Sequence, residues 1–266
     1  MRKANEVKES GVDSQFFLED EACPRWVKDL VSFLPLKSQF VLSRNIRDIY
    51  PVPLGGGNYV TMQLVPYLAE ILRSQGYRYF MAYNSMDGFS PVIPRGEDEK
   101  PVRQFLADTF KLSYDERGCY RCSLEKSLEV IARITGWKGD FVAVFADFAS
   151  RYPVRLDNLT APEHEYYTRA LMLGHSATPH VGQDMKTAMF NPLIWLCDKE
   201  NDLPDWLVLD NPRLRPIVVP KPDHVLRRAL VGSLSPKLTG YDKSAGEEQQ
   251  QIQEVFVDQT EGMVLT

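Results

Sequence analysis

The sequence has few cysteines and no long apolar run. Four cysteines in 266 residues are too few for a disulfide framework, so we expect a reducing, cytoplasmic setting. The longest apolar runs, such as residues 141–146, are the length of a strand and fall far short of the roughly 18 residues that indicate a membrane-spanning helix. The first ten residues (MRKANEVKES) are charged and lack the apolar region of a signal peptide. We therefore expect no membrane partner.

An excess of positive charge is also missing. The chain has 31 basic and 36 acidic residues, a net charge of −5, so a nucleic-acid partner is not indicated. The hydrophobic fraction of 44% and the aromatic fraction of 11% are those of a globular protein, which excludes a disordered, collagen-like or coiled-coil chain.

Motifs for metal, redox and serine-hydrolase chemistry are absent or incomplete. Cys119 and Cys122 form one C-x-x-C pair, but a zinc site needs four ligands and the four histidines are scattered. We expect two ordinary thiols and no metal site. No G-x-S-x-G segment marks a nucleophilic serine.

Five short apolar segments alternate with helical patterns along the chain. This alternation predicts an α/β fold, in which a mostly parallel five-stranded sheet is covered by helices on both faces. Such sheets bind ligands beyond the carboxyl ends of their strands, so the residues that follow each strand are the candidates for function. The predicted strands are residues 40–42, 77–83, 141–146, 193–197 and 217–219.

Acidic and polar residues follow two of these strands. Asp147 comes directly after residues 141–146, an arrangement typical of the Walker B motif, in which the carboxylate holds Mg²⁺. Phe148 stands where an active ATPase of this kind has a glutamate. Asp198 and Asn201 follow residues 193–197.

The segment between the first strand and the next helix is where a phosphate-binding loop would lie. Gly55, Gly56 and Gly57 are there, but no G-x-x-x-x-G-K-[ST] occurs anywhere in the chain. Arg44 and Arg47, beside Asp48, could bind an anion, although internal pairing is the more common use of such arginines.

The second half of the chain, residues 139–266, resembles an AAA+ ATPase module. The resemblance rests on the order of its parts: a strand that ends in Asp147, a strand followed by the polar loop DKENDLP, the segment NPRLR, the segment PKPD and the turn TEGM. It implies a three-layer sheet of the AAA+ (P-loop NTPase-like) type, with the strand at 193–197 inserted between those at 40–42 and 141–146.

The resemblance also implies roles and boundaries. Asp147 would be a relic Walker B residue, Asp198 and Asn201 would be sensor-like, and Arg213 and Arg215 would resemble arginine fingers that face a neighbouring subunit. Residues 21–222 would be a degenerate AAA-like domain and residues 223–266 the start of a helical lid. Residues 1–20 are polar, and we expect them to form a mobile N-terminal segment.

The missing lysine and glutamate imply that this module does not itself turn over ATP. We expect the N-terminal, structural or regulatory half of a larger ATPase, with a further AAA module after residue 266, homo-oligomer subunits or another protein as partner. ATP and Mg²⁺ would belong to the complete protein, and no cofactor is expected in this chain. Two alternatives stay open: an ATPase that binds nucleotide through an unusual loop at Gly55, Gly56 and Gly57, and a protein-interaction domain on a Rossmann-like scaffold.

Overall fold

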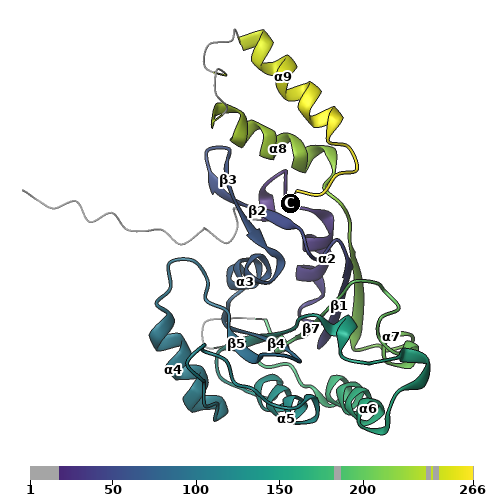
Figure 1. Ribbon diagram of the computed structural model, residues 1–266. Coiled ribbons are helices and arrows are strands. Elements are labelled where there is room, and N and C mark those ends of the chain that lie inside the picture. Colours follow the sequence, from purple (N-terminus) through teal and green to yellow (C-terminus); the bar gives the residue numbers. More distant parts are fainter. Residues whose placement is uncertain (1–17, 183–186, 238–240, 242–245, 266) are drawn as a thin grey trace, which may run out of the picture.

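The fold is built on a six-stranded, mostly parallel sheet with the strand order β5-β4-β6-β7-β1-β8. The computed structural model describes residues 18–182, 187–237, 241 and 246–265. Strand β5 is antiparallel to β4, and the other neighbours are parallel. The mostly parallel sheet is confirmed and all five predicted strands are present, but the predicted number of five is wrong, because β5 adds a sixth strand at the edge (Figure 1). The strands are β1 (Gln39–Arg44), β4 (Tyr77–Asn84), β5 (Gly88–Pro91), β6 (Phe141–Ala146), β7 (Leu193–Cys197) and β8 (Leu214–Val219).

The place of β7 in the sheet is the one expected from the resemblance. Strand β7 lies between β1 and β6, and β8 lies on the other side of β1. The connection from β7 to β8 therefore passes over β1. The predicted insertion of the strand at 193–197 is confirmed.

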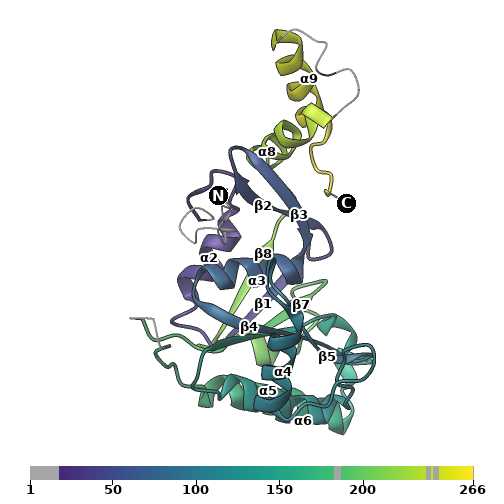
Figure 2. The ribbon, with the colours of Figure 1, turned by 90° about the vertical axis from the view of Figure 1, so that its left-hand side faces the viewer.

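The sheet has apolar side chains on both faces because helices cover both. In β1, Phe40 and Leu42 belong to one buried cluster, whereas Val41 between them belongs to the other. Neighbouring residues of a strand point to opposite faces, so this assignment gives the three layers that the sequence predicted. Helices α2 (Arg25–Phe33) and α3 (Leu64–Ser74) cover the first face (Figures 1 and 2). The second face is covered by α4 (Glu99–Phe110), α5 (Leu124–Thr135), α6 (Ala161–Ser176) and the short α7 (Asp205–Val208).

The helices on the second face begin at the capping residues that the sequence contains. Ser123 accepts a hydrogen bond from the backbone N–H of Lys126 at the start of α5. Thr160 and Glu163 form a capping box at the start of α6. These ends are set by local side-chain bonds, which is why they can be read from the sequence.

A β-hairpin that the sequence analysis did not predict lies between β1 and α3. Its strands are β2 (Ile49–Gly55) and β3 (Asn58–Gln63), which pair only with each other. Gly55, Gly56 and Gly57 form its turn, all with a positive φ of 90°, 61° and 76°. Glycine adopts this left-handed conformation without the steric cost of a Cβ atom, so the turn itself accounts for the three glycines.

The last two helices, α8 (His224–Leu234) and α9 (Gly246–Gln259), pack against each other beyond the hairpin (Figure 1, top). Asp223 caps α8 by accepting from the N–H of Leu226. The buried guanidinium of Arg227 donates to the carbonyl of Val257 at 3.3 Å and so joins the two helices. The predicted lid at residues 223–266 and the division into segments at 20 and 222 stay predictions, and most of the predicted N-terminal segment, residues 1–17, lies outside the described residues.

Short contacts connect the helical pair to the rest of the chain. The N–H of Tyr59 in the hairpin donates to the hydroxyl of Ser233 in α8 at 3.3 Å. The N–H of Leu265, beyond α9, donates to the carboxylate of Asp48 at 2.7 Å. In the part of the chain that is described, no helix combines the length and apolar character needed to cross a bilayer.

Candidate functional site

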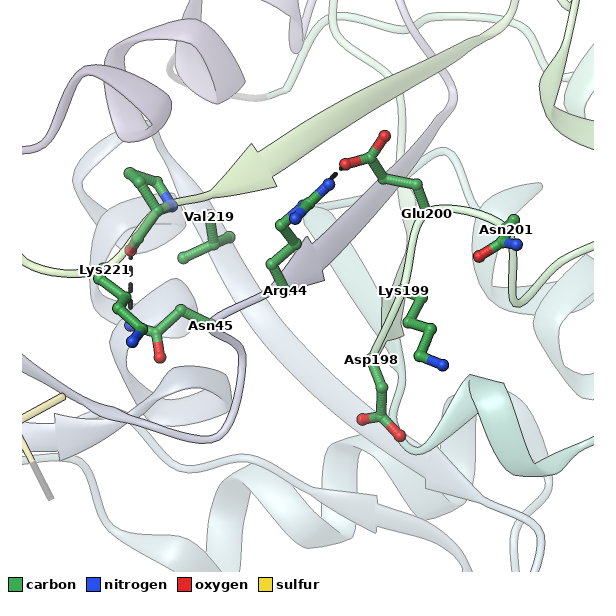
Figure 3. Close-up of a pocket in the computed structure, with 9 residues that line it drawn as sticks. Arg44, Asn45, Asp198, Lys199, Glu200, Asn201, Val219 and Lys221 are labelled. Atoms are coloured by element: carbon green, nitrogen blue, oxygen red, sulfur yellow. Dashed lines mark hydrogen bonds and ion pairs between the residues drawn. The ribbon is translucent and has the colours of Figure 1, made fainter. Parts of the chain in front are cut away.

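The carboxyl ends of β1, β7 and β8 surround the candidate site. A cavity of about 750 Å³ opens there. It lies where parallel α/β sheets usually hold ligands. Figure 3 shows its lining, which carries both signs of charge. The lining residues are Arg44, Asn45, Asp198, Lys199, Glu200, Asn201, Val219, Pro220 and Lys221.

Arg47 connects the two acidic residues that the sequence analysis singled out. Its Nη1 atom donates to Oδ1 of Asp147 at 2.6 Å, and its Nε atom lies 3.9 Å from Oδ1 of Asp198. The centre of the guanidinium lies 3.7 Å from the ring centroid of Phe148, a cation–π contact. The arginine thus holds the ends of β6 and β7 to the loop after β1.

The backbone is strained at two points of this edge. Arg44 at the end of β1 has a φ of 81°, and Phe148 after β6 has a φ of 53°. A left-handed conformation costs a residue with a side chain about 1–2 kcal/mol, so other contacts must hold it in place. At Phe148 these contacts are visible: its N–H donates to Oδ1 of Asp147 at 2.8 Å, and its ring contacts Arg47.

Asp198 has further partners that the sequence analysis missed. Nη2 of Arg151 donates to its Oδ2 atom at 3.0 Å, and its own backbone N–H donates to the hydroxyl of Ser150 at 2.7 Å. Both partners lie in the turn after β6. Only the order of the strands brings this turn next to the end of β7, and no motif in the sequence announces it.

The remaining pairs at the cavity are more exposed. Nε of Arg44 at the end of β1 donates to Oε1 of Glu200 in the loop after β7 at 2.9 Å, the pair joined by a dashed line in Figure 3. Solvent screens this pair, so it contributes little to stability. The expected internal pairing of Arg44 and Arg47 is confirmed, with acids from other strands as partners. Asn201 lines the same cavity as Asp198.

The predicted glycine site lies elsewhere in the fold. Gly55, Gly56 and Gly57 form the turn of the hairpin, which packs beside α8 rather than against the strand ends. Their role in binding a cofactor stays a prediction.

Within the described part of the chain, the carboxyl edge of the sheet lacks the parts that hold a Mg²⁺–nucleotide complex. A phosphate site of this class requires a glycine-rich turn that leads directly from strand to helix, with backbone N–H groups and a lysine around the phosphates. Here a 7-residue and a 6-residue strand fill that connection, and a guanidinium already pairs with Asp147. The residues present are a poor fit to Mg²⁺–ATP.

Arg213 and Arg215 lie at the opposite edge of the sheet, near the amino end of β8. The guanidinium of Arg215 donates to both carboxylate oxygens of Asp29 in α2, from Nη2 to Oδ1 at 3.1 Å and from Nε to Oδ2 at 3.3 Å. The guanidinium of Arg213 lies 5.7 Å from the ring centroid of Phe190. Arg215 is therefore engaged within its own chain, and a finger role for either arginine stays a prediction.

The C-x-x-C pair lacks the lowered thiol pKa that is typical of a reactive site. Cys119 and Cys122 are both free thiols. Burial raises the pKa of Cys122 to about 11 and also raises the pKa of Cys119. Reactive cysteines have lowered pKa values instead. Among the described residues, no three His, Cys, Asp or Glu side chains gather in a way that could hold a metal ion.

The comparisons with known proteins agree with the fold. Residues 13–220 match the sequence model of a family described as the AAA+ chaperone, N-terminal Rossmann-like domain. A search of curated proteins finds no match. The matched segment contains the whole six-stranded sheet and covers well over half of the chain. The chain therefore belongs to the family of AAA+ chaperone N-terminal Rossmann-like domains.

Proposed function

We propose that this domain is a structural or regulatory half of an AAA+ chaperone and does not itself hydrolyse ATP. The observation that carries the proposal is the bridge from Arg47 to Asp147 and Asp198. An arginine of the same chain supplies the positive charge at the position where this class of site holds a metal ion.

Charge at the carboxyl end of β6 disfavours a Mg²⁺–nucleotide complex. The guanidinium of Arg47 already supplies a positive charge to the carboxylate of Asp147, at 2.6 Å. Mg²⁺ would have to displace the guanidinium from Asp147, and the nucleotide would lack the lysine that a phosphate-binding loop supplies, because the sequence has no G-x-x-x-x-G-K-[ST] segment. Both the metal and the phosphates therefore lack the electrostatic stabilisation that hydrolysis requires.

Membership of the family bears on where ATP hydrolysis takes place. An AAA+ chaperone uses ATP and Mg²⁺ as a complete protein, and its N-terminal domain works together with other modules or subunits. We infer that these supply the hydrolysis, and that this domain contributes shape, assembly contacts or partner binding. Localisation in the cytoplasm belongs to the same proposal.

The test is a calorimetric titration with Mg²⁺–ATP and Mg²⁺–ADP. The wild-type chain and Arg47→Ala should show no saturable binding in the micromolar range, because removing the arginine does not restore a phosphate loop. Micromolar affinity that is lost in Asp147→Ala but kept in Asp157→Ala would refute the proposal and favour an ATPase with an unusual loop. Asp157 is an exposed acid that does not line the cavity.

A second test uses the complete chaperone. Deletion of residues 1–222 should alter its assembly or its ATPase rate, since the proposal gives this domain a structural or regulatory task. A deletion variant that assembles, hydrolyses ATP and acts as a chaperone as well as the complete protein would contradict the proposal.

A further inference from the structure

The net negative charge of the chain arises from one segment at its C-terminal end. Residues 246–266 contain five acidic side chains and no basic one. The other residues of the chain hold 31 acidic and 31 basic side chains, so the net charge of −5 belongs to α9 and the turn after it. The five acids are Glu247, Glu248, Glu254, Asp258 and Glu261.

The same helix has an apolar face that nothing in the described chain covers. Ile252, Val255 and Phe256 are 39%, 47% and 52% exposed, whereas Val257 is the one residue of α9 that is buried. The spacing of three and four residues places the exposed three on one face, which we call the outer stripe. Two more exposed apolar residues, Met263 and Val264, follow the helix.

Acidic residues border the outer stripe. Glu248 lies one helical turn before Ile252, and Asp258 lies three residues after Val255, so both share this side of the helix. Figures 1 and 2 show α9 at the end of the molecule farthest from α5 and α6, where solvent can reach it. An apolar stripe bordered by charge is typical of a surface that binds a partner.

The charge selects the kind of partner. Nucleic acids and anionic membranes carry the same sign as α9, so they would be repelled. A second copy of α9 would bring like charges together, which costs binding energy. An apolar ridge bordered by lysine or arginine complements both the stripe and the acids.

We propose that the outer stripe binds a cationic amphipathic helix of another polypeptide. The apolar side of that helix would cover Ile252, Val255 and Phe256, and its basic residues would face Glu248 and Asp258. Burial of a phenylalanine and two aliphatic side chains supplies the affinity, and the acids supply orientation and rate of association. This proposal deepens the partner-binding part of the proposed function and rests on it.

The experiment measures fluorescence anisotropy of a labelled helical peptide with leucine and lysine at amphipathic spacing. The full chain should bind it, and the affinity should fall as salt rises, because exposed charges are screened. A peptide of the same pattern with glutamate for lysine should not bind. The double variant Val255→Gln, Phe256→Gln should weaken binding by about tenfold or more, since apolar contact carries the affinity.

A matched control keeps the test specific. Val154→Gln with Met172→Gln removes two exposed apolar side chains far from α9 and should leave peptide binding unchanged. All four positions are exposed, so the variants should fold. Equal binding of the two peptides, or binding that survives the double variant in α9, would overturn the proposal.

A photo-crosslinking amino acid at Ile252 then identifies the partner in cells that make the full chain. The captured segments should be cationic and amphipathic. Capture of a second copy of the chain, or of lipid, would contradict the proposal. The nucleotide titration is unaffected by these outcomes, so failure here is distinguishable from failure of the non-hydrolysing role.

Discussion

Arg47 and Asp147 lie 100 positions apart in the sequence, yet the guanidinium donates to the carboxylate at 2.6 Å. The contact joins the loop after β1 to the end of β6, two strands that β7 separates in the sheet. It also fixes Phe148, whose ring lies under the guanidinium. One side chain thereby pairs with the acid that follows β6 and packs on the ring of the next residue.

Arg47→Ala should lower the free energy of unfolding by about 1 kcal/mol, measured by urea denaturation. The ion pair is partly exposed and contributes modestly, and the cation–π contact adds a similar amount. The control is Arg78→Ala, which removes a more exposed pair with Asp140 and should change stability by less. Equal losses in the two variants would mean that the bridge has no special role.

The sequence could predict the sheet because its strands are local features. Each parallel strand is a short apolar run that is buried on both sides, and such a run is visible without knowledge of its neighbours. Strand β5 could not be predicted from the sequence because its four residues are too few to give a clear pattern. The hairpin is not evident from the sequence because prolines such as Pro51 and Pro53 are unfavourable inside a larger sheet, where each backbone N–H is needed for pairing. A two-stranded ribbon tolerates them, because each of its strands has a partner on one side only.

The candidate site could be predicted only in part for the same reason. Asp147 and Asp198 each follow an apolar strand, so their position at the carboxyl edge follows from local pattern. Their shared partner Arg47 does not, because the bridge depends on the order of the strands and on the path of the loop at residues 45–48. Ser150 and Arg151 were missed on the same ground.

Asn191→Ala should cost about 2–3 kcal/mol of unfolding free energy. Asn191 is 2% exposed, its Oδ1 atom accepts from the N–H of Val142, and its Nδ2 atom donates to the carbonyls of Ile134 and Trp137. The variant removes these three hydrogen bonds, and although the carbonyl of Ile134 keeps the bond from the N–H of Trp137, the N–H of Val142 loses its Asn191 partner in the core, which costs free energy. Thermal denaturation followed by circular dichroism measures the loss.

The comparison for this prediction is Asn201→Ala. Asn201 lines the open cavity, where water replaces any bond that the amide makes, so its loss should leave the melting temperature nearly unchanged. If Asn191→Ala melts within a degree or so of the wild type, the three buried hydrogen bonds do not hold this part of the fold together.

Cys119 and Cys122 should react slowly with iodoacetamide at neutral pH. The thiolate is the reactive form, and burial raises the pKa of both thiols, that of Cys122 to about 11. Both groups are therefore protonated near pH 7, and the rate should increase as pH rises toward the pKa. Mass spectrometry of timed samples gives the rate at each cysteine, and faster modification than that of a free cysteine at pH 7 would restore a redox role.

Gly88→Ala should destabilise the chain far more than Gly57→Ala, although both glycines have a positive φ, 82° and 76°. A Cβ atom at Gly88 would collide with the carbonyl oxygen of Tyr120 and would lie 2.8 Å from the Cα atom of Arg121. This backbone cannot move freely, because Phe89 and Tyr120 exchange hydrogen bonds of 2.9 and 2.7 Å. At Gly57 nothing lies within 4 Å, so only the conformational cost remains, about 1 kcal/mol.

Overpacking adds about 1–3 kcal/mol more to the loss of unfolding free energy at Gly88. Urea denaturation of the two variants separates the conformational cost from the cost of overpacking. Equal losses of unfolding free energy would show that Tyr120 packs against β5 more loosely than these distances indicate.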